Sequence, residues 1–380
     1  MKTYGFGIVG CGTISDFHAA GIKDLAAEGR ARLVAAAEPV EERRKTFAEK
    51  HGCDVAADYR EMVRRKDVDV VCICTPSGAH LEPALAAIQA GKHVVVEKPI
   101  EVTLDRVDTL LRACDENRVR LCAIFPMRFA EHARAMKAAI AAGRFGRLTV
   151  GDCYCKWWRS QEYYDKGGWR GTWKLDGGGA CMNQAIHGID LIQWFMGPLD
   201  RIVAFSARLA HERIEVEDTA VAALRYKNGA MGVIECATSV HPGSDRKIEI
   251  HGDKGTAIMT DESILQWDFA EERPEDAGIR EKFSPAKIVQ KEKAASDPSA
   301  FSHKGHLEQL KDFLEALDND REPFVGGREG RKAVEIITAL YRSARTGKPV
   351  RLPLRPGLQS RWRGPEMRIA DCGIQVVEGR

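Results

Sequence analysis

The stretch Tyr4-Gly5-Phe6-Gly7-Ile8-Val9-Gly10-Cys11-Gly12-Thr13-Ile14-Ser15 carries the strongest fold signal in the chain. Its first six residues predict a short buried strand, and a helical pattern then extends to about Glu28. Gly10 would allow the tight turn between them, and Gly12 would let the backbone approach a pyrophosphate, with Ser15 as the third small residue. N–H groups at the helix start would then hold the anion. The predicted dinucleotide contacts are Gly10, Gly12, Thr13 and Ile14.

A second predicted strand, residues 32–37, ends in Glu38. A carboxylate at this strand tip can accept hydrogen bonds from the hydroxyls of an adenosine ribose, and it would repel a 2′-phosphate. We therefore predict NAD as the cofactor. Arg43 and Arg44 lie close enough in the sequence to meet a phosphate, which keeps NADP as the alternative. The other interpretation of Glu38 is a solvated loop residue.

Two further apolar segments, residues 68–74 and 93–96, have the pattern of parallel strands that are covered on both faces. The first runs into Thr75-Pro76-Ser77, whose backbone and hydroxyl groups could line a cofactor. The second ends in Glu97-Lys98-Pro99, at the strand end where doubly wound sheets bind their ligands. The Lys98 ammonium could hold a substrate hydroxyl, polarise a carbonyl or tune a neighbouring base. The alternative is a surface lysine on a turn.

A predicted helix begins after Asp176-Gly177-Gly178-Gly179 and ends near Gly197-Pro198. Asp176 would accept hydrogen bonds from free N–H groups at its start. Asn183, His187 and Asp190 stand four and then three residues apart, which places all three on one face of an α-helix. A histidine with an amide and a carboxylate as neighbours is suited to acid/base chemistry. The alternative is a buried histidine that its neighbours cap for structural reasons.

Together these motifs resemble the Gfo/Idh/MocA oxidoreductases (glucose–fructose oxidoreductase, inositol dehydrogenase and rhizopine catabolism proteins). The resemblance covers nearly the whole chain. It implies a Rossmann domain followed by a substrate domain on an open, largely antiparallel sheet, and pyridine-nucleotide oxidation or reduction of a sugar-like alcohol. The residues that carry it are the glycine loop with His18, Thr75-Pro76 with His80, Glu97-Lys98-Pro99, the triple glycine with His187 and Asp190, and residues 347–353. The cofactor contacts that it implies are Thr75, Pro76, His80, Glu97 and Lys98.

The same resemblance implies Lys98 and His187 as catalytic residues, and we expect Asn183 to join them by helping Lys98 to fix the reacting hydroxyl. Lys98 would lie beside the substrate and the nicotinamide, and His187 would be the general acid/base. Inositol dehydrogenases of this family carry an aspartate four residues before the histidine, where this chain has Asn183. Other members, including oxidases of nucleotide-linked sugars, are similar to this chain at that position. An amide can orient a hydroxyl but cannot share its proton, so Asn183 argues against an inositol substrate.

Residues 157–173 are dense in Trp, Tyr, Arg and Lys. Sugar rings stack on aromatic side chains and bond their hydroxyls to Arg and Lys, so this composition suits a polyol or glycoside. The alternative is that these aromatics pack the sheet or a subunit contact. The predicted substrate contacts are Arg128, Tyr163, Tyr164, Arg170, Asn183 and His187.

The predicted fold is an α/β Rossmann domain over residues 1–123, then an α+β domain with an open, mainly antiparallel sheet over residues 124–354, and a C-terminal extension, residues 355–380. Hairpin signals occur at Asn228-Gly229 and at residues 252–255.

The composition and periodicity of the last third of the chain predict one loop and two helices. Residues 271–298 are charged and contain prolines, which predicts a surface loop. Residues 305–317 and 330–346 predict helices, with Leu310, Phe313 and Leu317 on one face of the first.

Bulk composition limits the classes of partner. The chain has 57 basic and 55 acidic residues and a formal net charge of +2, which gives no electrostatic case for nucleic acid or a membrane. Its 11 cysteines include C-x-C pairs but no zinc knuckles, so we expect reduced thiols and a cytoplasmic protein without a signal peptide. His303 and His306 have no third candidate ligand near them in the sequence, so we expect no metal site.

We therefore expect an NAD-dependent oxidoreductase that moves hydride between the hydroxyl carbon of a sugar, polyol or glycoside and the nicotinamide. One alternative is a redox-neutral enzyme that retains NAD, such as an epimerase, a glycoside-cleaving enzyme or a sugar–sugar oxidoreductase. A nucleotide-sensing protein without turnover is less favoured, because Lys98 and His187 are both present. The outer face of the antiparallel sheet must be covered, which predicts a homodimer or homotetramer.

Overall fold

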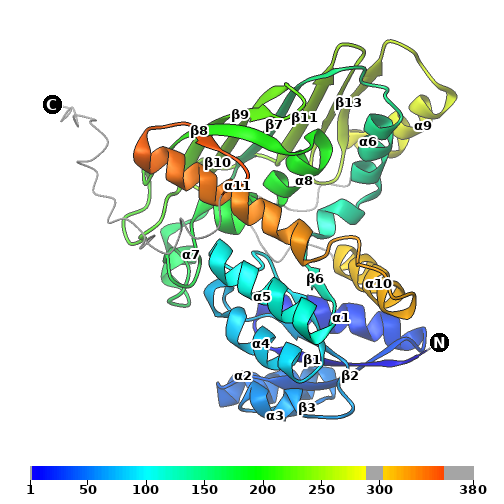
Figure 1. The fold of residues 1–380 in the computed structure, drawn as a ribbon, viewed down its shortest axis with the longest axis vertical. Helices are drawn as coiled ribbons and strands as arrows, with labels where there is room; N and C mark the ends of the chain where they lie inside the picture. The colour runs from blue at the N-terminus through cyan, green and yellow to red at the C-terminus, as the bar shows by residue number, and fades with distance from the viewer. Residues whose placement is uncertain (1, 288–302, 355–380) are drawn as a thin grey trace.

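The computed structural model describes residues 2–287 and 303–354. In Figure 1 a small sheet with its helices forms the lower part of the molecule and a large sheet forms the upper part, with helix α11 running between them. None of the helices in these two ranges is both long and apolar enough to cross a membrane.

The small sheet is the predicted Rossmann sheet. Its six strands have the order β3-β2-β1-β4-β5-β6, and every neighbouring pair is parallel. Central strands such as β4 are buried along their whole length, because helices cover both faces. The strands are β1 (Tyr4–Val9), β2 (Ala31–Ala37), β3 (Asp54–Ala56), β4 (Val70–Ile73), β5 (His93–Val96) and β6 (Leu121–Ala123).

The helices of this half follow the strands in alternation, as the sequence pattern predicts. They are α1 (Thr13–Ala27), α2 (Glu41–His51), α3 (Tyr59–Val63), α4 (Leu81–Gln89) and α5 (Leu104–Asn117), with a short 3-10 turn, η1 (Ser77–Ala79), before α4.

The large sheet confirms the prediction of an open, mainly antiparallel sheet. Its eight strands have the order β13-β12-β11-β7-β10-β9-β8-β14, and only β7 and β10 pair in parallel. Hairpins join β9 to β10 and β11 to β12 at the two predicted turns. The strands are β7 (Leu148–Lys156), β8 (Leu199–Ala207), β9 (Thr219–Tyr226), β10 (Met231–Ala237), β11 (Lys247–Gly252), β12 (Gly255–Met259), β13 (Ile264–Phe269) and β14 (Val350–Arg351).

Helices cover one face of the large sheet, with α8 against β7 and α11 against β8. The helical elements of this half are η2 (Pro126–Phe129), α6 (Glu131–Ala141), α7 (Gln161–Asp165), a π-helical turn η3 (Ala180–Ala185), α8 (Ile186–Met196), α9 (Pro274–Lys282), η4 (Pro285–Lys287), α10 (Lys304–Asp318) and α11 (Gly327–Thr346).

The prediction of a surface loop over residues 271–298 is wrong in its first part, where the chain forms α9. Asp276 caps this helix by accepting from the Arg273 N–H at 2.7 Å, and its carboxylate also binds Trp267 Nε1 and Arg144. Arg144 comes from a distant segment, so local composition carried no sign of this ion pair. Residues 288–298, and the predicted extension 355–380, lie outside the described residues.

Helix α10 returns from the second half of the chain to the first and packs against α1 (Figure 1). Leu310 and Phe313 are fully buried, in one apolar cluster with Phe6 and Ile22. Leu317 is partly buried against the same cluster, which fits the predicted apolar face of this helix. The domain boundary at residue 123 stays a prediction, and α10 completes the nucleotide-binding half from beyond it.

Candidate active site

One large cavity, of about 2140 Å³, lies at the carboxyl ends of the small sheet's strands and extends to the second half of the chain. The glycine loop and Glu38 line it from the first half. Residues of the 157–170 loop, Asn183 and His187 line it from the second, and the start of α10 closes one side. Ligands of doubly wound sheets bind at this strand edge, because helix starts and loops converge there.

The glycine loop has the shape that a dinucleotide needs. Gly10 has φ +91°, and a Cβ there would lie 2.9 Å from the carbonyl of Cys74, so only glycine fits. A Cβ on Gly12 would meet no protein atom within 4 Å, although Gly12 lines the cavity. Gly12 is also the N-cap of α1 and brings no side-chain cap to it. The open space and the uncapped helix start therefore fit a pyrophosphate.

Glu38 is held at the tip of β2 with its carboxylate at the cavity. Only 6% of the residue is exposed. Its two oxygens accept from the Cys11 and Val40 N–H groups, each at 3.0 Å. Arg44 donates to the backbone carbonyl of Glu38 at 2.6 Å instead of reaching the cavity, whereas Arg43 does line it. A fixed carboxylate here suits the ribose hydroxyls of NAD.

His80 joins the two loops that flank the cofactor position. Its ring nitrogens lie 2.9 Å from the carbonyl oxygens of Thr75 and Pro99. Burial lowers the pKa of His80, whereas the charge of Glu101 and the two carbonyl oxygens act in the opposite direction. The structure thus gives His80 a part in holding the loops that carry Thr75, Pro76 and Lys98.

Lys98 reaches from the end of β5 to the π-helical turn. Its Nζ donates to the backbone carbonyl of Asn183 at 2.7 Å. Burial lowers the pKa of Lys98, and the charge of Glu97 opposes this effect. π-helical turns are rare and, where they occur, are frequently at functional sites. Here the turn carries the backbone oxygen that accepts from Lys98.

The expectation that Asn183, His187 and Asp190 form one group holds only in part, because Asn183 and His187 line the cavity and Asp190 does not. Residues 180–185 form a π-turn, so the α-helical spacing does not apply between Asn183 and His187. Asp190 is buried and forms a bidentate ion pair with Arg128, whose Nη2 and Nε donate to the two carboxylate oxygens at 2.6 and 2.7 Å. Among the described residues no hydrogen bond links His187 to Asn183 or Asp190. Arg128 also binds Glu329 and does not line the cavity, so its predicted contact with substrate is not supported.

His187 lines the cavity and packs edge-on against Phe125, with ring centroids 5.8 Å apart. Burial, followed by the charges of Lys98 and Arg246, lowers the pKa of His187 well below its usual range. The imidazole is therefore neutral at neutral pH and can accept a proton.

Asn183 is fixed by its neighbours. Its Nδ2 donates to Asp176 Oδ1 at 2.5 Å, and its Oδ1 accepts from Gln184 Nε2 at 3.0 Å. Asp176 does not cap the helix as predicted. The N–H groups of Gly179 and Cys181 go to the buried carboxylate of Glu217, which approaches from the strand region before β9.

The aromatic loop divides into a cavity part and a packing part. Tyr163 and Arg170 line the cavity, with the Arg170 guanidinium 4.8 Å from the Tyr163 ring. Tyr164 is buried against Ile214, and its hydroxyl bonds the Thr238 hydroxyl at 2.7 Å. The predicted substrate contact of Tyr164 is therefore not supported, because Tyr164 does not line the cavity and its ring and hydroxyl are both used in packing.

Sequence reasoning missed Arg246, at the start of β11. It is 2% exposed, lines the cavity and lies 2.9 Å from Asp261. Its Nη1 is buried and has no hydrogen-bond partner in the described part of the chain. Arg159 also lines the cavity and binds Gln184. Arg159 belongs to the aromatic stretch 157–173, whereas no local pattern marks Arg246, which reaches the cavity from a distant segment.

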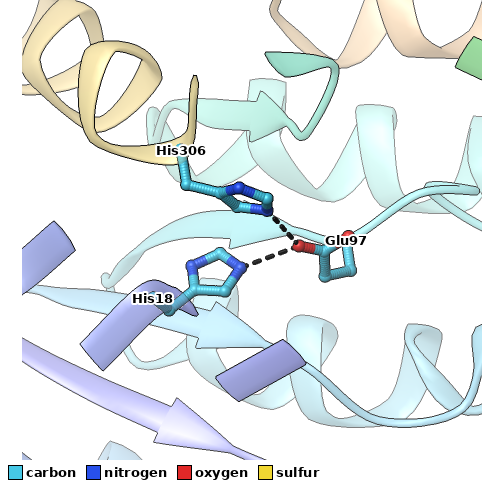
Figure 2. Close-up of side chains that lie close together, drawn as sticks. All are labelled: His18, Glu97 and His306. Atoms are coloured by element: carbon cyan, nitrogen blue, oxygen red, sulfur yellow. Dashed lines mark hydrogen bonds and ion pairs between the residues drawn. The ribbon is translucent and has the colours of Figure 1, made fainter. Parts of the chain in front are cut away.

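Glu97 forms a second cluster beside the cavity with His18 of α1 and His306 of α10 (Figure 2). His306 thus has two ligand-type residues beside it in space that are far from it in the sequence, and one ligand atom from each of the three residues lies within 4.8 Å of the other two. The expectation of no metal stays a prediction.

Comparison with known proteins agrees with this geometry. Residues 4–125 match the family model of an oxidoreductase family with an NAD-binding Rossmann fold, and residues 133–258 match the GFO/IDH/MocA C-terminal domain. The WlbA dehydrogenase from Bordetella pertussis, solved in complex with NADH and UDP-GlcNAcA, is 36% identical with a TM-score of 0.84, over 93% of this chain and 99% of that one.

Two further relatives are similar over most of their length. The WlbA dehydrogenase from Chromobacterium violaceum, also solved with NADH and UDP-GlcNAcA, is 32% identical with a TM-score of 0.84, over 93% of this chain and 97% of that one. The myo-inositol 2-dehydrogenase of Thermotoga maritima is 27% identical over 370 residues, 91% of this chain and 98% of the relative.

Proposed function

The chain belongs to the GFO/IDH/MocA family of NAD-binding oxidoreductases, and we propose that it oxidises a hydroxyl group of a negatively charged sugar with NAD. The observation that carries this proposal is the shared cavity, in which the glycine loop and Glu38 lie at one end and Lys98, His187 and a group of arginines lie at the other. A hydride donor and acceptor bound there would both be enclosed by the same walls.

The nucleotide end supplies the cofactor contacts. Gly12 and the start of α1 would hold the pyrophosphate, and Glu38 would hold the ribose hydroxyls. When bound, NAD supplies the site that accepts hydride from the substrate carbon.

Two side chains would assist the transfer of hydride from the substrate. His187, neutral because of its lowered pKa, would take the proton from the substrate hydroxyl as the C–H bond breaks. Lys98, held by the Asn183 carbonyl, would donate to the same oxygen and stabilise the negative charge that develops on it. Asn183 would keep this arrangement rigid, because Asp176 and Gln184 hold its amide on both sides.

The proposed charge of the substrate follows from the arginines. Arg159, Arg170 and Arg246 line the cavity with Lys98, and the charges of Lys98 and Arg246 both act on His187. Asp261 pairs with only one side of Arg246, which leaves Nη1 as a buried donor. Buried unpaired donors are costly unless a ligand satisfies them. A sugar carboxylate or a sugar-linked diphosphate would do so, and the relative from Bordetella pertussis was solved with a ligand of this class.

The cavity volume supports a substrate larger than a simple polyol. At about 2140 Å³ it exceeds the roughly 300–1,000 Å³ of an ordinary small-molecule pocket. A nucleotide-linked sugar beside NAD would fill such a space, with Tyr163 and Arg170 available to stack on its rings.

Location and assembly belong to the same proposal. All ten cysteines in the described ranges are free thiols, which supports a cytoplasmic location. We also propose a homodimer or homotetramer, with residues 1–123 and 124–354 as the two domains of each protomer.

The test is a substrate panel scored for NADH by absorbance, with uncharged sugars and polyols, glycosides, free uronic acids and nucleotide-linked uronic acids. We expect the highest kcat/KM with a charged sugar. His187→Asn should bind NAD normally and lose turnover by roughly 10²- to 10⁴-fold, the range for loss of a general base.

Three outcomes would contradict parts of this proposal. A neutral polyol as the best substrate would refute the charged-sugar class. Near-normal turnover by His187→Asn would remove His187 as the base. Conversion of a sugar without NADH release, by protein that keeps NAD through purification, would support the redox-neutral alternative.

A further inference from the structure

Glu97 lies between the cofactor wall and the catalytic lysine, and three donors hold its carboxylate. His18 Nε2 and His306 Nε2 lie 2.9 Å and 3.2 Å from the same oxygen, Oε1 (Figure 2). The other oxygen, Oε2, accepts from the backbone N–H of Lys98 at 3.1 Å. The glutamate therefore connects α1, α10 and the end of β5 at one point.

The hydrogen bonds define the protonation of this cluster. A carboxylate only accepts, so each imidazole must carry a proton on Nε2. The Nδ1 atoms of His18 and His306 are buried and have no hydrogen-bond partner in the described residues. The two histidines hold the pKa of Glu97 well below its usual range, against the effect of burial. Burial also lowers the pKa of His18. The cluster is thus an anionic carboxylate whose Oε1 accepts from both rings and whose Oε2 accepts from the Lys98 N–H.

We propose that Glu97, held in place by His18 and His306, is a positioning residue that sets the location and charge of Lys98 and His187. The inference rests on the proposed function only in treating Lys98 and His187 as the reacting pair. The effect of Glu97 on the position of Lys98 follows from two hydrogen bonds. The backbone N–H of Lys98 donates to Glu97, and the side chain of Lys98 extends from there to the Asn183 carbonyl.

The charge of Glu97 acts on both reacting groups. It is the largest effect that keeps the pKa of Lys98 up, where burial lowers it. It also raises the pKa of His187, where burial and the charge of Lys98 lower it. Without this carboxylate, both groups would lose protons at lower pH.

Other charged groups face the same pair from several elements, and their signs are mixed. Asp176 raises the pKa of Lys98, whereas Arg159 and Arg246 lower it. Arg246 and His306 lower the pKa of His187. Glu97 is the carboxylate common to both groups, so its removal has a predictable sign at each of them.

His306 also links the cluster to the wall of the cavity. It lies in the first turn of α10, and residues 304–308 form part of the cavity wall. Its bond to Glu97 therefore ties the start of α10 to the wall beside Lys98. Loss of this bond should change the binding of ligands in the cavity as well as the charge of Glu97.

The test compares pH profiles of kcat for sugar oxidation in the wild type and Glu97→Gln. Activity requires neutral His187 and charged Lys98, so it rises with pH on the acid side and falls on the alkaline side. Glu97→Gln should move both limbs to lower pH, and kcat in alkaline buffer should fall by roughly tenfold or more.

Variants of His306 provide the matched comparison. His306→Gln keeps an N–H donor near the Nε2 position, so its pH profile should have the acid and alkaline limbs of the wild type. His306→Leu has no donor there, so both limbs should move to lower pH, as in Glu97→Gln. His303→Gln is the control, because His303 stands in the same segment but does not belong to the cluster. Its Nε2 lies 2.8 Å from Asp24 Oδ2. The His306 pair keeps the test valid if Glu97→Gln fails to fold.

Two results would overturn the inference. A loss of kcat that is equal at every pH, with unmoved limbs, would show that Glu97 only supports the fold. One equivalent of Zn²⁺ bound by the wild type, absent in His18→Gln and required for activity, would assign the cluster to a metal instead. Failure of the proposed function is distinguishable, since it would appear as an active His187→Asn enzyme regardless of the Glu97 result.

Discussion

At the scale of single residues, burial strongly raises the pKa of Asp176 at the substrate end. It is 1% exposed, and its carboxylate accepts from the Gly171 N–H at 2.8 Å and from Asn183. Burial raises its pKa from 3.8 to about 7, despite these bonds and the charge of Lys98. The local sequence marks Asp176 only as a candidate helix cap before a glycine run, so its raised pKa is a property of the packed site.

We predict that Asp176 makes stability depend on pH. Below about pH 4 it is protonated in both the folded and unfolded states, and above about pH 7 the folded state must bury its charge. Stability of the wild type relative to Asp176→Asn should therefore fall between these pH values, by an amount on the order of 3–4 kcal/mol. Urea unfolding of both proteins at pH 4.5 and pH 8 measures it. An equal difference at the two pH values would contradict the burial argument.

At the scale of elements, the glycine loop and the π-turn show how backbone shape prepares the cavity. Gly10 has a positive φ and a close contact with Cys74 that only glycine tolerates, whereas a Cβ on Gly12 would meet no protein atom within 4 Å. The π-turn at residues 180–185 exposes the Asn183 carbonyl to Lys98. The first feature follows from a short motif, but α-helical and π-helical turns have the same composition, so the second could not be predicted.

The two glycines allow a matched prediction. Gly12→Ala should leave the unfolding free energy within about 0.5 kcal/mol of the wild type, because its Cβ meets no protein atom. Its NAD affinity should fall by roughly tenfold or more, since the methyl group enters the space for the pyrophosphate. Gly10→Ala should instead lose about 1–3 kcal/mol of stability through its positive φ and its contact with Cys74. Calorimetric NAD titration and urea unfolding separate the two effects. Wild-type NAD affinity in Gly12→Ala would place the pyrophosphate elsewhere.

At the scale of the whole molecule, the large sheet has one face covered by helices and one face with exposed apolar side chains. Phe205 of β8 and Val221 of β9 are register partners, with 76% and 46% of their surfaces exposed. Met231 of β10 is 63% exposed. An apolar patch of this kind on a wide sheet marks an interaction surface, and a second copy of the chain is the simplest cover for it.

We predict that Phe205→Lys shifts the protein toward monomer, as measured by light scattering at micromolar concentration. A charge in a buried apolar contact is costly, so the assembly should weaken. Val55→Lys, on β3 in the nucleotide half and 37% exposed, is the control and should leave the assembly unchanged. A wild-type protein that is a monomer under these conditions would refute the assembly.

The sequence alone determined the features that depend on local periodicity and on short motifs. The alternating strands and helices, the Gly10–Gly12 loop, Glu38 at a strand tip, Lys98 after β5 and the two hairpins all appear where they were predicted. Each is encoded within a dozen or so neighbouring residues, where steric and hydrogen-bond preferences of the backbone act directly.

Only the tertiary structure decided which buried polar groups pair. Asp190 joins Arg128 instead of His187, Glu217 caps the helix that Asp176 was expected to cap, and Tyr164 packs while Tyr163 faces the cavity. The same holds for His18, Glu97 and His306. A buried polar group must find a partner among the groups that packing brings near it, and that choice depends on contacts between segments far apart in the chain.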